Sequence, residues 1–259
     1  MITITSDFGL RDPYVAELKG VILTINKGAN IIDVTHNVEK FNIRMGAFIL
    51  ASAAPYFPNG TIHLAVVDPG VGTERRGILV QTKQGYFVGP DNGILLIAAQ
   101  NQEITHAYEL TNPKFMLPKV SGTFHGRDIF APAAAYLDMG VKPFEFGPDI
   151  IDLVAPDFTF VKQRNGSLIG EVLHADSFGN IITNINQKEI VQAKFIRVKL
   201  EKISLNLALV KTYSSAKSQE AIALIGSHGF LEIALNLANA AEKFNVKAGD
   251  LVEVTADWI

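Results

Sequence analysis

Hydrophobic and polar positions in the first quarter of the chain follow two different periods in turn. Residues 1–5, 31–35 and 61–67 are short runs rich in β-branched side chains, which predict strands. Between them, apolar side chains recur at helical spacing in residues 13–25 and 43–56. This succession of strand, helix, strand, helix and strand predicts parallel strands with helices on both faces of the sheet.

The pattern changes after the third predicted strand. Residues 77–88 predict a hairpin, and residues 129–137 predict an apolar helix. Proline and glycine then interrupt residues 144–160, which we interpret as a linker. Four short strand-like runs follow it, at residues 166–173, 195–200, 221–225 and 251–254. We therefore expect an N-terminal α/β domain with a parallel sheet (residues 1–150) and a small β-barrel or sandwich (residues 158–259).

Composition narrows the classes of function. The chain has 259 residues, 48% of them hydrophobic, and its mean hydropathy of +0.21 argues against disorder. A net charge of -3 and a pI near 6.1 provide no basic surface for a phosphate backbone, so a small molecule is a better partner than nucleic acid. There are no cysteines, which removes disulfides, thiolate nucleophiles and Cys-ligated zinc.

The beginning of the chain carries no recognisable targeting signal. It opens directly on a predicted strand, without a basic and apolar leader, and no apolar run is long enough to span a bilayer. We therefore expect a cytoplasmic protein that does not interact with membranes.

Asp68 is the first candidate for chemistry. It follows the predicted strand 61–67, and ligands of α/β sheets bind at the carboxyl ends of strands. The loop after it is rich in glycine and contains Arg75, whose guanidinium could fold back over the carboxylate. The alternative is that Asp68, Pro69 and Gly70 form only a turn.

Asp7 and His125 also lie where predicted elements meet. Asp7 follows the first strand, where a carboxylate can accept both hydroxyls of a ribose, although a turn aspartate would look the same. His125 precedes a glycine and a predicted helix, so its ring could face an anion-binding backbone or could simply pack or cap. Neither G-x-G-x-x-G after the first strand nor a P-loop motif is present, which disfavours the usual dinucleotide and phosphate sites.

Two stretches of the second region combine polar and small residues. Residues 176–184 contain a carboxylate, an aromatic ring and two amides, a set suited to the ammonium and carboxylate of an amino acid. Residues 226–232 contain small residues whose backbone could approach a flat heterocycle closely. Turn formation alone could also explain each stretch.

Five motifs together resemble one family, the S-adenosyl-L-methionine (SAM) hydroxide adenosyltransferases, which are related to the fluorinase and chlorinase. The motifs occur in the family's order, at residues 6–9, 67–75, 123–128, 176–184 and 226–232. The resemblance implies an α/β domain followed by a β-barrel, and a homotrimer with active sites between the first domain of one subunit and the second domain of a neighbour. It also implies a reaction in which water displaces methionine from the ribose C5′ of SAM, giving adenosine and L-methionine.

The same resemblance implies a role for each matching residue. Asp68, Arg75 and His125 would be catalytic, with Asp68 taking the proton and His125 as relay. The residues implied to bind substrate are Asp7 on the ribose hydroxyls, Phe41 beside the ribose, Phe178 on adenine, Asp176 and Asn180 at the methionine or ribose end, and Ser227 and Glu232 on methionine or the adenine edge. Tyr14 and His228 are left without a role. No cofactor is expected, and no metal, because no H-E-x-x-H or comparable spacing is present.

Two alternatives to hydrolysis stay open. One is a module that binds SAM or adenosine without turnover, and the other is a halide-dependent SAM 5′-halogenase. The halide-using relatives carry other residues at the positions of Asp68 and His125 and have a loop in the first domain that this chain lacks. These departures favour water over halide as the nucleophile.

Overall fold

The computed structural model describes residues 1–190, 194–200 and 203–256. The chain divides into two compact units, Met1–Ala155 and Pro156–Ile259. The first unit is an α/β domain and the second is a β-barrel, as the sequence and the resemblance predicted.

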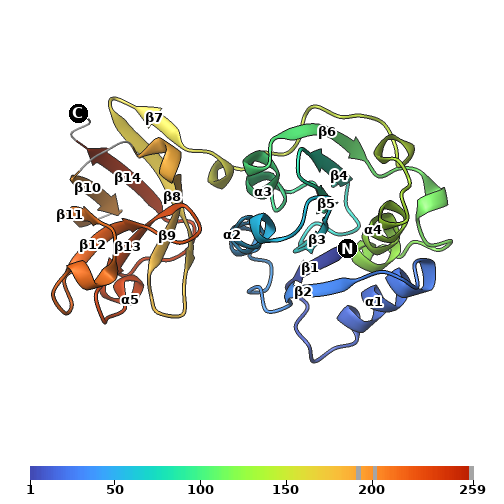
Figure 1. Ribbon diagram of the computed structural model, residues 1–259, viewed down its shortest axis with the longest axis horizontal. Coiled ribbons are helices and arrows are strands. Elements are labelled where there is room, and N and C mark those ends of the chain that lie inside the picture. The colour runs from blue at the N-terminus through green and yellow to red at the C-terminus, as the bar shows by residue number, and fades with distance from the viewer. Residues whose placement is uncertain (191–193, 201–202, 257–259) are drawn as a thin grey trace. The chain divides into compact units, whose positions relative to one another are not determined.

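A six-stranded mixed sheet forms the centre of the first unit (Figure 1). Its strands lie in the order β2-β1-β3-β5-β4-β6. The first four strands in this order are parallel, and β4 runs antiparallel to both β5 and β6. The bounds are β1 Ile2–Ser6, β2 Ile31–Thr35, β3 Ile62–Val66, β4 Gly77–Thr82, β5 Tyr86–Pro90 and β6 Ile104–Glu109. The predicted parallel strands and hairpin are therefore confirmed.

Helices cover both faces of this sheet (Figure 1). On one face α1 packs against α4, and on the other α2 packs against α3. The bounds are α1 Tyr14–Ile25, α2 Ile43–Ala53, α3 Leu96–Asn101 and α4 Ala131–Asp138. Because α1 and α4 are apolar on the side facing the sheet, they bury a continuous core with the strands.

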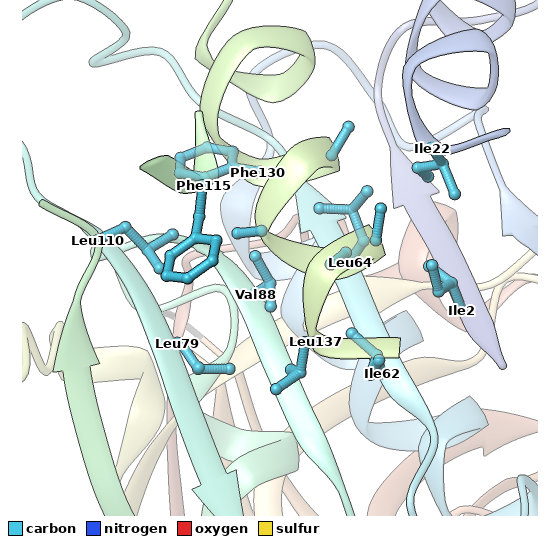
Figure 2. Close-up of a cluster of buried hydrophobic side chains, with 14 of the residues drawn as sticks. Ile2, Ile22, Ile62, Leu64, Leu79, Val88, Leu110, Phe115, Phe130 and Leu137 are labelled. Carbon is cyan, nitrogen blue, oxygen red and sulfur yellow. The ribbon is translucent and has the colours of Figure 1, made fainter. Parts of the chain in front are cut away.

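Figure 2 shows that core, in which large aliphatic and aromatic side chains from strands, helices and loops interdigitate. Ile2, Ile62 and Leu64 come from the parallel strands, and Ile22 comes from α1. Phe130 stands at the beginning of α4 and is fully buried. This residue fixes the segment that contains His125 to the sheet.

The beginnings of two helices differ from the sequence prediction. Pro13, which was expected at the first helical position after an Asp12 cap, is itself the N-cap of α1. The apolar helix predicted from residue 129 begins with a π-helical turn, Gly126–Phe130, before α4. Such turns often occur at functional sites, and this one follows His125 directly.

The second unit is a barrel closed by seven strands. The strands lie in the order β14-β10-β11-β12-β13-β9-β8, and β14 pairs with β8 to close the ring, while the short β7 pairs with the beginning of β8. Its bounds are β7 Lys162–Arg164, β8 Ser167–Ala175, β9 Ile181–Asn186, β10 Phe195–Leu200, β11 Ile203–Val210, β12 Ala221–Ile225, β13 Phe230–Leu235, α5 Ala240–Phe244 and β14 Leu251–Ala256. Closure removes the open edges that a sheet would otherwise expose.

Two of these strands overlap the stretches that the sequence suggested as binding segments. β9 occupies the end of residues 176–184, and β13 includes residues 230–232. Both strands are almost completely buried, so their polar residues sit on a rigid frame. Within the described part of the chain, no helix has the length and apolar character needed to cross a membrane.

Candidate active site

A buried ion pair forms where the chain leaves β3. Asp68 lies two residues beyond the end of the strand, and Arg75 lies two residues before β4 begins. Arg75 Nη2 donates to Asp68 Oδ2 at 2.5 Å, and the two side chains are only 9% and 6% exposed. A simple solvent-exposed turn would not bury a charged pair, so the functional interpretation of this loop gains support.

His125 completes this group from a distant part of the sequence. Arg75 Nη2 lies 3.0 Å from His125 Nδ1. An arginine only donates hydrogen bonds, so Nδ1 must accept, which places the proton of the neutral ring on Nε2. Burial and the charge of Arg75 both lower the pKa of His125, although Asp68 opposes them. The imidazole is therefore held neutral beside the guanidinium.

Two glycines allow the loops of this group to approach each other. Gly72 has φ of +77°, and a Cβ built on it would lie 2.1 Å from the carbonyl oxygen of Gly122. Gly77 faces the ring of Phe130, where a Cβ would lie 2.7 Å from the ring edge. The Arg75 guanidinium lies 5.3 Å from the centre of the same ring. These close approaches bring the loop with Asp68 and Arg75 against the segment with His125.

Asp68 has one carboxylate oxygen engaged and one open. Oδ2 accepts from Arg75, whereas Oδ1 is buried and has no hydrogen-bond partner among the residues that the structure describes. Burial raises the pKa of Asp68, against the opposing effects of Arg75, His125 and the nearby backbone N–H of Gly70. A buried carboxylate oxygen without a partner is costly unless it serves a ligand or a reaction. Oδ1 is thus suited to accept a hydrogen bond from a bound water.

Asp7 leaves the sheet at the same edge as Asp68. The parallel register pairs Ser6 with Val66, so the residues that follow each strand emerge side by side. Asp7 is 6% exposed, and its Oδ2 accepts from the backbone N–H of Phe41 at 3.0 Å. Phe41 has φ of +65° and a ring that is 68% exposed. The expected ribose ligand and its expected aromatic neighbour are therefore in contact.

Three aromatic rings join the Asp7 loop to the segment of His125, a contact that sequence reasoning did not predict. The ring of Phe124 lies 5.5 Å from Phe8 and 5.3 Å from Tyr14, in edge-to-face arrangements. Phe8 and Tyr14 are 5.8 Å apart. Tyr14, which had no assigned role, packs here. The sequence signal that could have indicated this contact is that Phe8 follows Asp7 directly and Phe124 precedes His125 directly.

In the second unit, the polar groups of Asp176 and Asn180 bind each other. Asp176 Oδ1 accepts from the backbone N–H groups of Phe178 and Asn180 at 2.9 and 2.8 Å, and Oδ2 accepts from Asn180 Nδ2 at 2.9 Å. This arrangement is a side-chain-stabilised turn. The turn presents the ring of Phe178, which is 78% exposed. Phe178 is thus the group of this loop that is available to a ligand.

Glu232 forms the polar centre of the second unit's candidate residues. It lies on β13, is 6% exposed, and accepts from the Tyr213 hydroxyl at 2.7 Å. Burial and nearby Asp176 raise the pKa of Glu232, and the Tyr213 hydroxyl opposes them. A Cβ on Gly226 would lie 1.7 Å from the Glu232 carboxylate, which explains the glycine beside the exposed Ser227. Sequence reasoning missed Tyr213.

The predicted residues thus fall into two groups, one in each unit. The first unit contains Asp7, Phe41, Asp68, Arg75 and His125, and the second contains Asp176, Phe178, Asn180, Ser227 and Glu232. Within the ranges described above, no cluster of three or more His, Cys, Asp or Glu side chains has the geometry to hold a metal ion.

Comparison with known proteins gives full-length matches. The family model described as SAM hydroxide adenosyltransferase N-terminal domain matches residues 2–147, and the model of the C-terminal domain matches residues 170–253. An (R)-S-adenosyl-L-methionine hydrolase from Methanocaldococcus jannaschii is 39% identical over 98% of this chain and 95% of its own. A fluorinase from Actinoplanes is 28% identical over 98% of this chain and 97% of its own. The crystal structure of an uncharacterized conserved protein from Thermotoga maritima superimposes with a TM-score of 0.86 and 39% identity, covering 98% of this chain and 100% of that one.

Proposed function

The chain belongs to the SAM hydroxide adenosyltransferase family, and from this premise we propose that it hydrolyses SAM to adenosine and L-methionine. Family membership supplies the substrate. The single structural observation that supports turnover is the buried Asp68 carboxylate, held through one oxygen by Arg75 and open at the other.

The reaction is a displacement at the ribose C5′. The oxygen of a water molecule forms a bond to C5′ as the C5′–S bond breaks. The electron pair of the C5′–S bond goes to sulfur. Methionine leaves as a neutral thioether, so departure needs no acid. The water loses one proton. The barrier therefore lies in holding a weak nucleophile in line with the breaking bond, which is a problem of positioning.

Asp68 is proposed to accept the proton of this water. Free water has a pKa of about 15.7, so a carboxylate cannot deprotonate it before attack, and proton removal must accompany bond formation. Arg75 holds Asp68 in place and, as a preorganised cation, is proposed to stabilise the negative charge that develops on the attacking oxygen. His125 contacts the same guanidinium through Nδ1, so it is proposed to position the water through its Nε2–H group, and the expected relay of the proton is not part of this proposal.

The remaining candidates are proposed to bind the substrate. Asp7 would accept the 2′ and 3′ hydroxyls, with Phe41 beside the ribose. In the second unit, the exposed ring of Phe178 would stack on adenine, and the buried Glu232 would meet methionine or the adenine edge. Ser227 would assist Glu232, while Asp176 and Asn180 would hold the loop that carries the ring.

The family also suggests an assembly. We propose a cytoplasmic homotrimer in which the first domain of one subunit and the second domain of a neighbour complete each site. Support comes from the division of the candidate residues between two units, each with its own core. Sedimentation of the purified protein would test the stoichiometry.

The reaction itself is tested by incubation with SAM in ¹⁸O-labelled water. Hydrolysis by displacement predicts ¹⁸O on the 5′ carbon of adenosine and one methionine per adenosine, measured by mass spectrometry. Recovery of intact SAM would indicate a binding module instead. Supplying chloride should leave the products unchanged, and formation of 5′-chloroadenosine would indicate a halogenase.

A further inference from the structure

Strand β1 carries two buried hydroxyl–imidazole pairs of the same chemistry. At its beginning, Thr3 Oγ1 lies 2.8 Å from Nδ1 of His63 on β3. At its end, Ser6 Oγ lies 2.8 Å from Nδ1 of His36, the residue after β2. All four side chains are at most 4% exposed. The two pairs differ in one respect, because Ser6 immediately precedes Asp7.

The Ser6–His36 pair belongs to a longer polar chain. On the far side of the ring, His36 Nε2 lies 3.0 Å from Asp33 Oδ1. Asp33 Oδ2 in turn accepts from Lys19 Nζ of α1 at 2.6 Å. The Nε2 contact is an ion-pair distance whose geometry does not make a hydrogen bond, whereas Nδ1 is hydrogen-bonded to the Ser6 hydroxyl. The ring of His36 therefore lies between the Asp33 carboxylate and Ser6.

His36 also fixes the loop on both sides of Asp7. Its backbone carbonyl accepts from the N–H of Gly9 at 2.7 Å, while its ring holds Ser6. In return, the Ser6 carbonyl accepts from the N–H of Val38 at 3.3 Å. The segment that follows β2 is thus hydrogen-bonded to the residues immediately before and shortly after Asp7.

We propose that His36 and Ser6 are positioning residues for Asp7, and that they orient its carboxylate towards the ribose hydroxyls. This inference rests on the proposed function, in which Asp7 binds the ribose. Neither side chain is accessible to substrate, so both act through Asp7. A carboxylate that binds two adjacent hydroxyls needs a defined orientation, and supporting hydrogen bonds supply it.

The test compares the two pairs on β1. Ser6→Ala and His36→Gln remove the contact at Nδ1 of His36, whereas Thr3→Ala and His63→Gln remove the equivalent contact away from Asp7. We expect the first two variants to raise KM for SAM, and Kd for adenosine, by about three- to tenfold, the effect of losing one intramolecular hydrogen bond. Their kcat should change little. The Thr3 and His63 variants should lose stability without a change in KM or Kd.

Two further variants make the test specific. His36→Asn keeps a polar atom near the position of Nδ1 and should restore KM towards that of the wild type. The double variant Ser6→Ala/His36→Gln should match the single variants, because both changes remove the same contact. Equal KM in the Ser6 and Thr3 variants would overturn the proposal. It would also be overturned if KM across all four single variants rose in proportion to their loss of stability. Wild-type protein that neither binds adenosine nor turns over SAM would instead refute the proposed function.

Discussion

Replacing Gly72 by alanine should separate the loops that bring Arg75 and His125 together. The added Cβ would stand 2.1 Å from the carbonyl oxygen of Gly122, whereas real contacts of this kind are essentially never below 3.0 Å. The two loops must therefore move apart by about 1 Å. Arg75 lies three residues after Gly72, and His125 lies three residues after Gly122, so the movement acts directly on their 3.0 Å contact.

The size of the effect follows from these distances. A misplacement of about 1 Å in a catalytic group can lower the rate by about 10²-fold. The left-handed backbone at Gly72, with φ of +77°, adds a separate penalty of about 1–2 kcal/mol for any other residue. The variant should therefore lose both kcat and some stability, with kcat as the larger and more specific loss.

Gly60→Ala separates the two effects. Gly60 has φ of +85° but nothing within 4 Å of its would-be Cβ, so its replacement carries the backbone penalty without the clash. SAM turnover and thermal unfolding would be measured for both variants. We expect both variants to lose melting temperature, Gly72→Ala by more because of the clash, and a large loss of kcat in Gly72→Ala alone. Equal kcat in the two variants would refute the idea that the approach of these loops sets the catalytic group.

Three further predictions use the same assays. Asp68→Asn should lower kcat by about 10² or more while adenosine still binds, because it removes the proposed proton acceptor, whereas Asp7→Ala should weaken adenosine binding. Burial raises the pKa of Asp68 above 3.8 and lowers that of His125 below 6.5, so kcat/KM should be level near neutrality and fall as pH drops between these values. Asp68→Asn should alter this acid limb. Burial also lowers the pKa of His63 to about 4, so stability present above pH 6.5 should be lost as pH falls towards 4. The gap corresponds to at most about 3 kcal/mol, and thermal unfolding of His63→Gln should show a weaker pH dependence.

The sequence predicted the first unit well because its elements are regular and local. Strands such as β1 and helices such as α1 were found from period alone, with ends within one or two residues. The second unit was harder, because β9 and β13 are short, buried on both sides and adjacent to glycine-rich turns. Their sequences look like loops until the barrel closes around them. In a barrel, long-range pairing overrides the local signal.

In the candidate site, too, the sequence predicted local features but not long-range contacts. The positions of Asp7 and Asp68 at strand ends were predictable, since parallel strands in register deliver their carboxyl ends to one edge. The contact between Arg75 and His125 was not predictable, because 50 residues separate them and their loops meet through tertiary contacts such as the approach of Gly72 to Gly122. The turn role of Asp176 was open to either interpretation, and hydrogen-bond geometry supports the turn.

The arrangement around Arg75 identifies which group can take a proton first. Burial and the guanidinium oppose each other at Asp68 but act together at His125, so the carboxylate gains basicity while the imidazole loses it. Nδ1 of His125 already accepts from Arg75, and Nε2 carries the ring proton, so the ring offers a donor to the attacking oxygen rather than a free acceptor. Asp68 Oδ1 is the one atom of this trio that is buried, basic and unengaged among the described residues. Proton removal at Asp68, with His125 holding the oxygen, is therefore the order of events that the hydrogen bonds permit without first breaking one.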